Sequence, residues 1–300
     1  MKKIAVVGAG KWGQALAHAL SQRCDVVITS RHRRELSNFV TLEEAMAREW
    51  VVVAISAQAV RSWLQEHRAL LGGQQFLIAS KGIEASTGAF MNDIFEEYVN
   101  EQRLSYLTGP SFAKEVMQSL PTALVVNSTN RLAAQEWCDA FPDFIKTYTS
   151  TDVVGAEVAG AYKNVIAIAS GICAGLELGE NAKAALVARG LVEMARFGTH
   201  FGARESTFLS LSGAGDLFLT ANSTLSRNFR VGLGLAAGKS LEEILQELGE
   251  VAEGVATARA LHRISLNNDL YLPIANEVFR ILEGKDPRES LKDLLSHRRS

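Results

Sequence analysis

The chain has 300 residues, of which 47% are hydrophobic and 21% are charged, and its formal net charge is −2. This length suits two domains of ordinary size, and the apolar content is high enough for folded cores, which argues against disorder. The small net charge provides no overall attraction to nucleic acid or to an anionic membrane, so any basic binding site must be local.

Metal, disulfide and membrane signals are weak. Cys24, Cys138 and Cys173 are odd in number and far apart, and the six histidines are scattered without HExxH spacing. We therefore predict neither disulfides nor a metal site. A strand is predicted directly after the first three residues, which leaves no room for a signal peptide, and the apolar run 165–176 is too short to span a bilayer. The predicted compartment is the cytoplasm, and no stable membrane insertion is expected.

The first predicted strand, 4–7, is followed by a glycine turn and a helical pattern. The turn has the spacing GxGxxG, formed by Gly8, Gly10 and Gly13. In this context Gly8 permits the tight turn, Gly10 lets the backbone approach a pyrophosphate, and Gly13 lets the helix pack close to the strand. The free N–H groups at the helix start favour an anion. We predict a dinucleotide-binding site.

The second predicted strand, 26–29, ends in a basic segment. In NAD-binding folds a carboxylate at this position accepts hydrogen bonds from the ribose 2′-hydroxyl. Here Arg31, Arg33 and Arg34 occur in its place, and guanidinium groups pair well with a 2′-phosphate. The sequence therefore predicts that NADP(H) is preferred and that NAD(H) is also accepted. The alternative is an ordinary solvated basic loop.

The remaining strands of the first half alternate with helical patterns, which predicts a parallel sheet wound on both faces, the doubly wound Rossmann-type α/β fold. Lys81 follows one strand, and Gly109 and Ser111 follow the next. Ligands bind at such carboxyl ends of strands, although either segment alone could be a simple turn. The seven predicted strands are 4–7, 26–29, 51–55, 76–79, 105–108, 123–126 and 145–148.

No strand signal follows residue 148, and potential helix caps at 150–152 precede a long apolar run. We therefore place the domain boundary near residue 150, with a dinucleotide-binding domain over 1–150 and an all-α substrate and catalytic domain over 151–300. Residues 296–300 are predicted to be a solvated tail. The predicted helices are 152–177, 181–201, 205–210, 216–221, 226–238, 240–248, 254–267 and 273–283.

Polar residues at three places in the second half are candidates for chemistry. Lys163 lies inside an apolar helix, where a cation is costly unless it is paired or catalytic. Asp216 follows two glycines and starts a predicted helix. Ser226, Arg227 and Asn228 open another helix with donors suited to phosphate, although Ser226 could be only an N-cap. The segment 249–254 could equally be a helix connector.

The blocks GAGKWGQAL, KGIEASTG, GPSFAKE, GAYKNVIAIASGI, GAGDLFLT, SRN and VAEG, in this order, closely resemble those of bacterial NAD(P)-dependent glycerol-3-phosphate dehydrogenases. The similarity covers nearly the whole chain, and seven ordered blocks are far more specific than one. It implies a two-domain fold of the 6-phosphogluconate-dehydrogenase-like type. It also implies reversible oxidation of sn-glycerol 3-phosphate to dihydroxyacetone phosphate with NAD(P), used mainly for glycerophospholipid synthesis.

The resemblance also implies roles for individual residues. Lys163 resembles the catalytic proton acceptor, and Lys81 resembles a residue that contacts both cofactor and substrate. The other substrate positions are Gly109, Ser111, Asp216, Ser226, Arg227 and Asn228. The cofactor positions are Gly8, Gly10, Lys11, Trp12, Gly13, Arg31, Lys81, Ala113, Arg227, Val251 and Glu253. A homodimer is common among such enzymes, although no segment of this sequence identifies an interface.

Three departures from the family pattern bear on these expectations. A stretch with a Leu-Pro-Gly turn, usual in relatives after the second strand, is missing between Leu36 and Thr41, which predicts a more open adenine side. Arg31 is followed by His32 rather than by Asp, which strengthens the NADP expectation. The usual Val-Pro-Ser after the third strand is replaced by the residues at 55–57, and the loss of proline alters that turn.

Two other functions remain open from the sequence. One is a hydroxyacid or phosphogluconate dehydrogenase of the same two-domain type, in which Asn typically follows the helical Lys by several residues. Here Asn164 is adjacent to Lys163. The other is a nucleotide-sensing module without activity, but such a protein would be expected to lose catalytic residues, and Lys81, Asp216 and Arg227 are all present.

Overall fold

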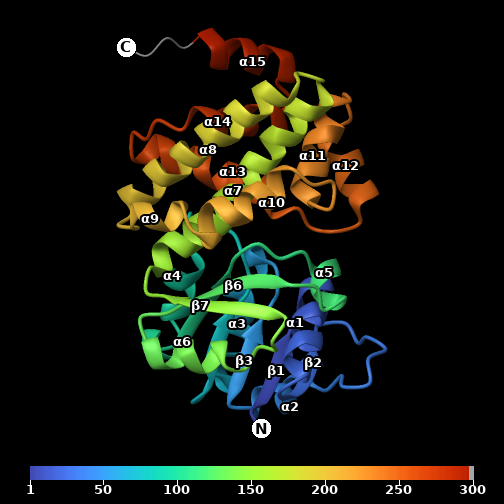
Figure 1. Cartoon of the computed structure of the whole chain (residues 1–300), viewed down its shortest axis with the longest axis vertical. Coiled ribbons are helices and arrows are strands. Elements are labelled where there is room, and N and C mark those ends of the chain that lie inside the picture. Colours follow the sequence, from blue (N-terminus) through green and yellow to red (C-terminus); the bar gives the residue numbers. More distant parts are fainter. Residues whose placement is uncertain (297–300) are drawn as a thin grey trace. The chain divides into compact units, whose positions relative to one another are not determined.

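The computed structural model describes residues 1–296, and these form two compact units (Figure 1). The first unit contains Met1–Lys81 and Met91–Glu157, and the second contains Gly82–Phe90 and the chain from Val158 onward. The units thus differ from the predicted division at residue 150, because the first keeps the start of a long helix and the second takes in a short earlier segment. Of the predicted tail, residues 297–300 lie outside the described part of the chain.

All seven predicted strands are present in the first unit, with ends that differ by one or two residues. The bounds are β1 (Lys3–Val7), β2 (Asp25–Thr29), β3 (Trp50–Val53), β4 (Gln75–Ile78), β5 (Leu104–Thr108), β6 (Thr122–Asn127) and β7 (Ile145–Ser150). They form one sheet in the order β2-β1-β3-β4-β5-β6-β7. The predicted Rossmann-type α/β fold is therefore confirmed for this unit.

The predicted parallel sheet has one antiparallel junction. The strands from β1 to β5 pair in parallel, but β5 and β6 pair antiparallel, with Leu107 opposite Val126. A parallel pair requires a crossover connection that carries the chain back across a face of the sheet. The connection from β5 to β6 contains only the short helix α5 (Ala113–Met117), which packs on α1 (Lys11–Ser21), so the chain returns in the opposite direction.

The helices of the first unit cover both faces of the sheet. In addition to α1 and α5 they are α2 (Leu42–Met46), α3 (Val60–Glu66), α4 (Met91–Glu96) and α6 (Arg131–Cys138). Every residue of β3 is buried, as expected for a strand with helices on both sides. On one face, Trp50 of β3 and Trp137 of α6 meet edge to face with ring centroids 4.9 Å apart. The packing of helices on the sheet holds the strands in place, and with them the loops that follow their carboxyl ends.

Part of the connection after β2 lies along the outer side of that strand. Ile28 and Phe39 form a parallel bridge, and the side-chain amide of Asn38 donates to the carbonyl of Val26 at 3.1 Å. The segment around Phe39 therefore partly covers β2, the edge strand of the sheet. The loop from Arg31 to Glu35 is exposed.

The second unit is helical, as predicted, and all eight predicted helices are present. Their bounds are α7 (Val153–Gly175), α8 (Glu180–His200), α9 (Glu205–Phe208), α10 (Asp216–Ala221), α11 (Arg227–Ala236), α12 (Leu241–Leu248), α13 (Glu253–Asn267) and α14 (Pro273–Leu282). A further helix, α15 (Pro287–Ser296), was not predicted. Lys285 anchors it by bonding both Glu277 of α14, at 2.7 Å, and Asp293 of α15.

The helices α7 and α11 cross with their backbones in contact. A Cβ atom on Gly171 of α7 would lie 2.1 Å from the carbonyl oxygen of Phe229, and one on Gly232 of α11 would lie 2.1 Å from that of Ile168. No side chain larger than hydrogen fits at either position. The two glycines thus bring the start of α11 close to the middle of α7.

A buried carboxyl group holds three helices of this unit together. Glu193 of α8 accepts the backbone N–H groups of Ile274 and Ala275 at the start of α14, at 2.9 and 2.8 Å, and the hydroxyl of Tyr162 of α7 at 2.8 Å. Burial raises the pKa of Glu193, while these hydrogen bonds oppose the shift. Because Tyr162 directly precedes Lys163, this network fixes the part of α7 that contains Lys163.

Candidate functional site

The turn between β1 and α1 has the backbone geometry predicted from its glycines. Gly8 has φ +114°, and its N–H donates to the carbonyl of Thr29 at 2.8 Å. A Cβ atom at this position would lie 2.4 Å from the carbonyl oxygen of Ala54. Only glycine satisfies both the positive φ and the close approach of the neighbouring strand end.

Gly10 and Gly13 have different surroundings. A Cβ atom on Gly13 would lie 1.7 Å from the carbonyl oxygen of Gly8, so this glycine permits the close packing of α1 against the turn. No atom lies within 4 Å of a Cβ on Gly10, which is the N-cap of α1 and provides no side-chain cap. Open space beside the first turn of an eleven-residue helix fits the pyrophosphate of a dinucleotide.

The other cofactor candidates of this unit surround the turn and the next strand end. Lys11 is exposed, and Trp12 is half-buried and packs on the core. In the loop after β2, the Nε of Arg31 lies 3.3 Å from Nε2 of His32, and the hydroxyl of Ser30 donates to the carbonyl of His32 at 2.7 Å. These contacts are local, and they leave the guanidinium of Arg31 at the surface.

Lys81 and the segment from Gly109 to Ala113 follow β4 and β5. Because β1, β3, β4 and β5 run in parallel and are adjacent, these residues lie at the same edge of the sheet as the glycine turn. Gly109 has φ +111°, and a Cβ there would lie 2.8 Å from the carbonyl oxygen of Ala123. The hydroxyl of Ser111 donates to the carbonyl of Gly109 at 3.1 Å. The first unit thus brings together all its predicted site residues at one sheet edge.

In the second unit, the structure pairs Lys163 with Asp216. Lys163 lies on α7 and is 7% exposed, and Asp216 begins α10 and is 1% exposed. The Nζ of Lys163 donates to Oδ1 of Asp216 at 2.5 Å and to the hydroxyl of Thr220 at 3.2 Å. A buried ion pair is a poor source of stability, because desolvating two charges costs about as much as their attraction returns. This arrangement therefore suits a reactive amine held in a fixed position.

Local structure explains why Asp216 is buried. Its helix continues directly from a π-helical turn, Leu211–Gly215, in which a Cβ on Gly213 would lie 2.3 Å from the carbonyl oxygen of Phe208. Irregular helical turns of this kind are frequent at functional sites. Gly213 and Gly215 are thus part of a tight helical turn that leads directly into Asp216.

The start of α11 contains the next three predicted residues. The hydroxyl of Ser226 accepts the N–H of Phe229 at 3.3 Å, so Ser226 is an N-cap, as its alternative interpretation predicted. The side chain of Arg227 is 43% exposed, and its guanidinium lies 3.3 Å from the carboxylate of Glu250. Asn228 is 7% exposed. A cation at an exposed helix N-terminus is suited to bind phosphate.

The last predicted cofactor contacts lie at the start of α13. Val251 is 55% exposed, and Glu253 is the first residue of the helix. The N–H of Gly254 donates to Oδ1 of Asn228 at 3.0 Å, and Nδ2 of Asn228 donates to Oδ1 of Asn164 at 2.9 Å. Asn228 therefore joins α11 to both α13 and α7.

Sequence reasoning did not identify three residues of this cluster as partners. Thr220 lies one helical turn after Asp216, a spacing that places both side chains on one face of α10. Asn164 is adjacent to Lys163, and Glu250 lies in the connector before α13. The sequence could have indicated only Thr220, through its spacing from Asp216. Glu250 and Asn164 contact residues that are far away in the sequence.

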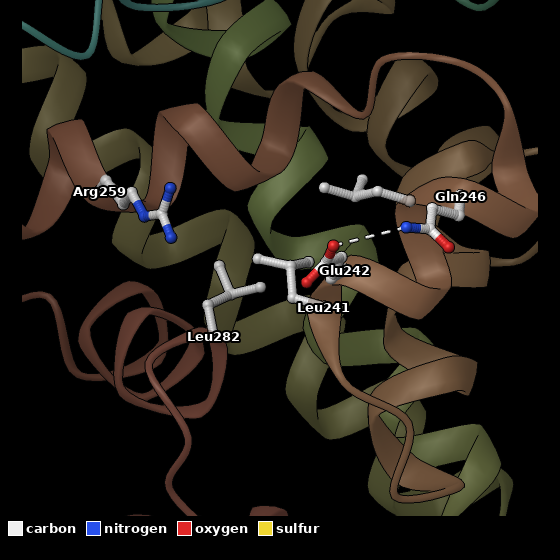
Figure 2. A pocket seen from close by; sticks show the side chains of 6 residues that line it. Leu241, Glu242, Gln246, Arg259 and Leu282 are labelled. Carbon is white, nitrogen blue, oxygen red and sulfur yellow. Dashed lines mark hydrogen bonds between the residues drawn. The ribbon is translucent and has the colours of Figure 1, made fainter.

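One concave surface of the helical unit contains none of the predicted site residues. It lies between α12, α13 and α14 and is lined by Leu241, Glu242, Leu245, Gln246, Arg259 and Leu282 (Figure 2). Its polar groups bind one another or adjacent residues: the Gln246 amide donates to Glu242, and Nε of Arg259 bonds Glu283 at 2.9 Å. We assign it no function.

Metal and membrane features are limited. Within residues 1–296, no group of three or more His, Cys, Asp or Glu side chains is arranged to hold a metal ion. In the same range one helix, α7, is long and apolar enough to cross a bilayer, but 89% of its most apolar window is buried inside the protein. Since α7 also contains the paired Lys163, it is a core helix of the second unit.

Family models match both halves of the chain. A model described as NAD-dependent glycerol-3-phosphate dehydrogenase N-terminus matches residues 34–134, and one described as NAD-dependent glycerol-3-phosphate dehydrogenase C-terminus matches residues 152–292. The chain is 61% identical over 297 residues to a protein of Sulfurimonas denitrificans, covering 99% of this chain and all of that protein. It is 57% identical to a protein of Nitratiruptor sp., covering 98% of each. Both are named glycerol-3-phosphate dehydrogenase, NAD(P)+.

Solved structures show the same two-part architecture. The chain matches glycerol-3-phosphate dehydrogenase from Coxiella burnetii with a TM-score of 0.92 and 28% identity, covering 99% of both chains. A complex of D-mandelate dehydrogenase with NADH matches with a TM-score of 0.64 and 13% identity over 95% of this chain and 99% of that one. The second likeness shows the fold alone.

Proposed function

Since the chain belongs to the NAD(P)-dependent glycerol-3-phosphate dehydrogenase family, we propose that it interconverts sn-glycerol 3-phosphate and dihydroxyacetone phosphate by hydride transfer with a nicotinamide cofactor. The observation that carries this proposal is the buried amine of Lys163, which Asp216 holds at 2.5 Å. The bound nicotinamide ring accepts or supplies the hydride.

Lys163 performs the proton transfer. In the oxidative direction, its neutral amine accepts the proton of the C2 hydroxyl at Nζ while the C2–H bond breaks and its electron pair leaves as hydride, which produces the C2 carbonyl. In the reductive direction, the ammonium group donates a proton to the oxygen at C2 and stabilises its developing negative charge. Asp216 and Thr220 hold Nζ in position through bonds of 2.5 and 3.2 Å.

The substrate phosphate is bound at the start of α11. Arg227 is half-exposed and is oriented by Glu250, and the positive end of the helix dipole favours an anion there. We propose that the guanidinium of Arg227 pairs with the phosphate oxygens. The other proposed substrate contacts are Asp216, Ser226 and Asn228 in the second unit and Lys81, Gly109 and Ser111 in the first.

We propose that NADP(H) is preferred and that NAD(H) is also used. The exposed loop after β2 contains Arg31, Arg33 and Arg34, and no carboxylate lies between β2 and Arg34 to bind a 2′-hydroxyl. The glycine turn binds the pyrophosphate common to both cofactors, supported by the open space beside Gly10. The remaining proposed cofactor contacts are Lys11, Trp12, Lys81, Ala113, Arg227, Val251 and Glu253.

One assay tests reaction, substrate and cofactor together. Reduction of dihydroxyacetone phosphate is followed by the loss of reduced-nicotinamide absorbance, with NADPH and NADH in parallel. Turnover with a higher kcat/KM for NADPH supports the proposal, and a strong NADH preference contradicts the cofactor assignment. If 6-phosphogluconate is oxidised and dihydroxyacetone phosphate is not reduced, the substrate assignment is wrong. Cofactor binding without turnover of either substrate would indicate a sensing module.

We propose that the enzyme operates in the cytoplasm, supplies glycerol 3-phosphate for glycerophospholipid synthesis and forms a homodimer. The burial of α7 inside the second unit supports the first part. Cells that lack the protein should then require added glycerol 3-phosphate for growth.

Light scattering of the purified protein tests the proposed homodimer, because the mass of a monomer would contradict it.

A further inference from the structure

The chain between β4 and α4 forms a short hairpin that belongs to the second unit. Ile83 and Phe90 form an antiparallel bridge, and the N–H of Glu84 donates to the carbonyl of Ala89 at 2.9 Å. The side chains of Ile83, Glu84 and Phe90 are buried. We call the segment Gly82–Phe90 the hairpin.

Both ends of the hairpin continue directly into the first unit. Lys81 precedes it and is the last residue of one part of that unit, and Met91 follows it and begins the other part. Just before Lys81, the hydroxyl of Ser80 donates to the carbonyl of Ile55 at 2.7 Å. At the other end, the N–H of Met91 is accepted by the carboxyl of Glu157 at 2.9 Å. The chain therefore leaves the first unit after Lys81 and returns to it at Met91.

The turn of the hairpin is attached to helix α13. Nη1 of Arg263 donates to the carbonyl of Ser86 at 2.9 Å. Gly88 has φ +84°, which favours glycine, and a Cβ atom there would lie 3.2 Å from the side chain of Ile264. The turn thus packs directly on α13, and one arginine bonds it there.

The base of the hairpin packs on aromatic rings of the same unit. Phe90 meets Phe201 and Phe197 of α8 edge to face, with ring centroids 5.5 and 6.2 Å apart. Phe197 in turn lies 5.4 Å from the ring of Tyr162 on α7, the residue directly before Lys163. Because closely packed buried rings tolerate little displacement, the base of the hairpin is fixed to the part of α7 that contains Lys163.

We propose that the hairpin positions Lys81, and that Arg263 is a positioning residue that acts through the hairpin. Lys81 lies only two residues before the bridged Ile83, a stretch of chain that spans at most about 7 Å, so a shift of the hairpin moves the backbone of Lys81. The bond from Arg263 to Ser86 therefore limits the movement of Lys81. The inference rests on the proposed function, since it takes Lys81 to contact cofactor and substrate.

Helix α13 offers a matched pair of arginines for the test. Arg259 lies one turn before Arg263 but bonds Glu283 at 2.9 Å. We expect Arg263→Ala to lower kcat/KM for dihydroxyacetone phosphate about fivefold, the effect of losing one hydrogen bond. Arg263→Lys, which keeps a donor, should restore most of the loss, and Arg259→Ala should cause none. An unchanged kcat/KM in Arg263→Ala, or an equal loss in Arg259→Ala, would overturn the proposal.

A double variant separates positioning of Lys81 from a general structural role. Lys81→Ala removes the side chain that the hairpin is proposed to position. In this background, Arg263→Ala should cause no further loss of kcat/KM, because the two changes act through the same residue. A further fivefold loss would show that Arg263 acts by another route, and it would overturn the proposal.

Hydrogen exchange of the free protein tests the hairpin without activity. The amide of Glu84, which donates to Ala89, should be equally protected in the wild-type chain and in Arg259→Ala, and it should exchange about fivefold faster in Arg263→Ala. Equal protection in all three proteins would overturn the inference, even if dihydroxyacetone phosphate is reduced. If the wild-type chain does not reduce dihydroxyacetone phosphate but only Arg263→Ala loses this protection, the proposed function is wrong and the attachment of the hairpin is right.

Discussion

The two parts of the proposed site are built in opposite ways. In the first unit, the candidate residues follow individual strands, and the glycine turn acts through backbone groups and open space. In the second unit, Lys163 is 7% exposed and bonds side chains of a helix more than fifty positions away. We propose that the first arrangement binds an anion through its backbone N–H groups, whereas the second holds one amine between two side chains. The difference predicts that substitutions in the two units will change different measured quantities, such as cofactor binding, kcat or the KM for the substrate.

The largest effect is expected at Lys163. Lys163→Met should lower kcat about 10³-fold, because no other proposed residue transfers the proton. Cofactor binding, measured by NADPH fluorescence, should be retained. Since the substitution leaves Asp216 buried without its cation, the variant Lys163→Met/Asp216→Asn provides a stable control with the same loss of rate. An unchanged rate in either variant would contradict the catalytic role.

The glycine turn provides a matched pair of substitutions. Gly10→Ala should leave stability unchanged, since its φ of −72° suits alanine and no atom lies within 4 Å of a Cβ at this position. It should weaken binding of both cofactors about 30-fold, because the methyl group occupies the space proposed for the pyrophosphate. Gly13→Ala should lower the free energy of unfolding by about 3 kcal/mol, because the methyl group meets the carbonyl of Gly8. Thermal unfolding and cofactor titration together check this contrast, and equal behaviour of the two variants would refute it.

Arg227 is expected to act mainly on the substrate phosphate. Arg227→Met should raise the KM for dihydroxyacetone phosphate about 20-fold, the effect of losing a charge-assisted hydrogen bond, with little change in stability because the side chain is 43% exposed. Arg230→Met, on the same helix and exposed, is the control. If both variants raise the KM equally, the effect comes from general charge rather than from a specific contact.

The basic loop after β2 should affect only one cofactor. Arg31→Ser is expected to raise the KM for NADPH about tenfold, because one charged partner of the 2′-phosphate is lost, and to leave the KM for NADH unchanged. Arg131→Ser, at the exposed start of α6, should change neither value. A parallel rise for both cofactors would show that Arg31 binds another part of the dinucleotide.

The last prediction concerns the pH dependence of stability and no kinetic parameter. Glu157 of α7 accepts the N–H of Met91 at 2.9 Å, and its burial raises the pKa of the carboxyl from 4.5 to about 8. The protonated carboxyl of Glu157 then makes its full contribution to the free energy of unfolding below about pH 4.5, and this contribution is lost as the pH rises through about 8. Glu157→Gln should remove this part of the pH dependence. Urea unfolding across that range checks it, and identical profiles for both proteins would contradict it.

The sequence was informative where structure is local. Strand and helix positions followed from apolar periodicity, and the glycine turn followed from the spacing of Gly8, Gly10 and Gly13 in one contiguous segment. The antiparallel β6 was missed, because periodicity contains no strand direction and the short α5 does not cross the sheet. The packing glycines Gly171 and Gly232 were also missed, since a glycine in an apolar helix does not identify its partner.

The sequence by itself determined the two-part fold, the dinucleotide turn and the family, because each depends on neighbouring residues or on the order of short blocks. Only the tertiary structure decided that Asp216 and Thr220 hold Lys163, and that Asn228 faces Asn164 and Gly254 instead of open solvent. Those contacts join helices that are distant in the sequence, and they form only when close packing excludes water and forces each buried polar group to find a partner.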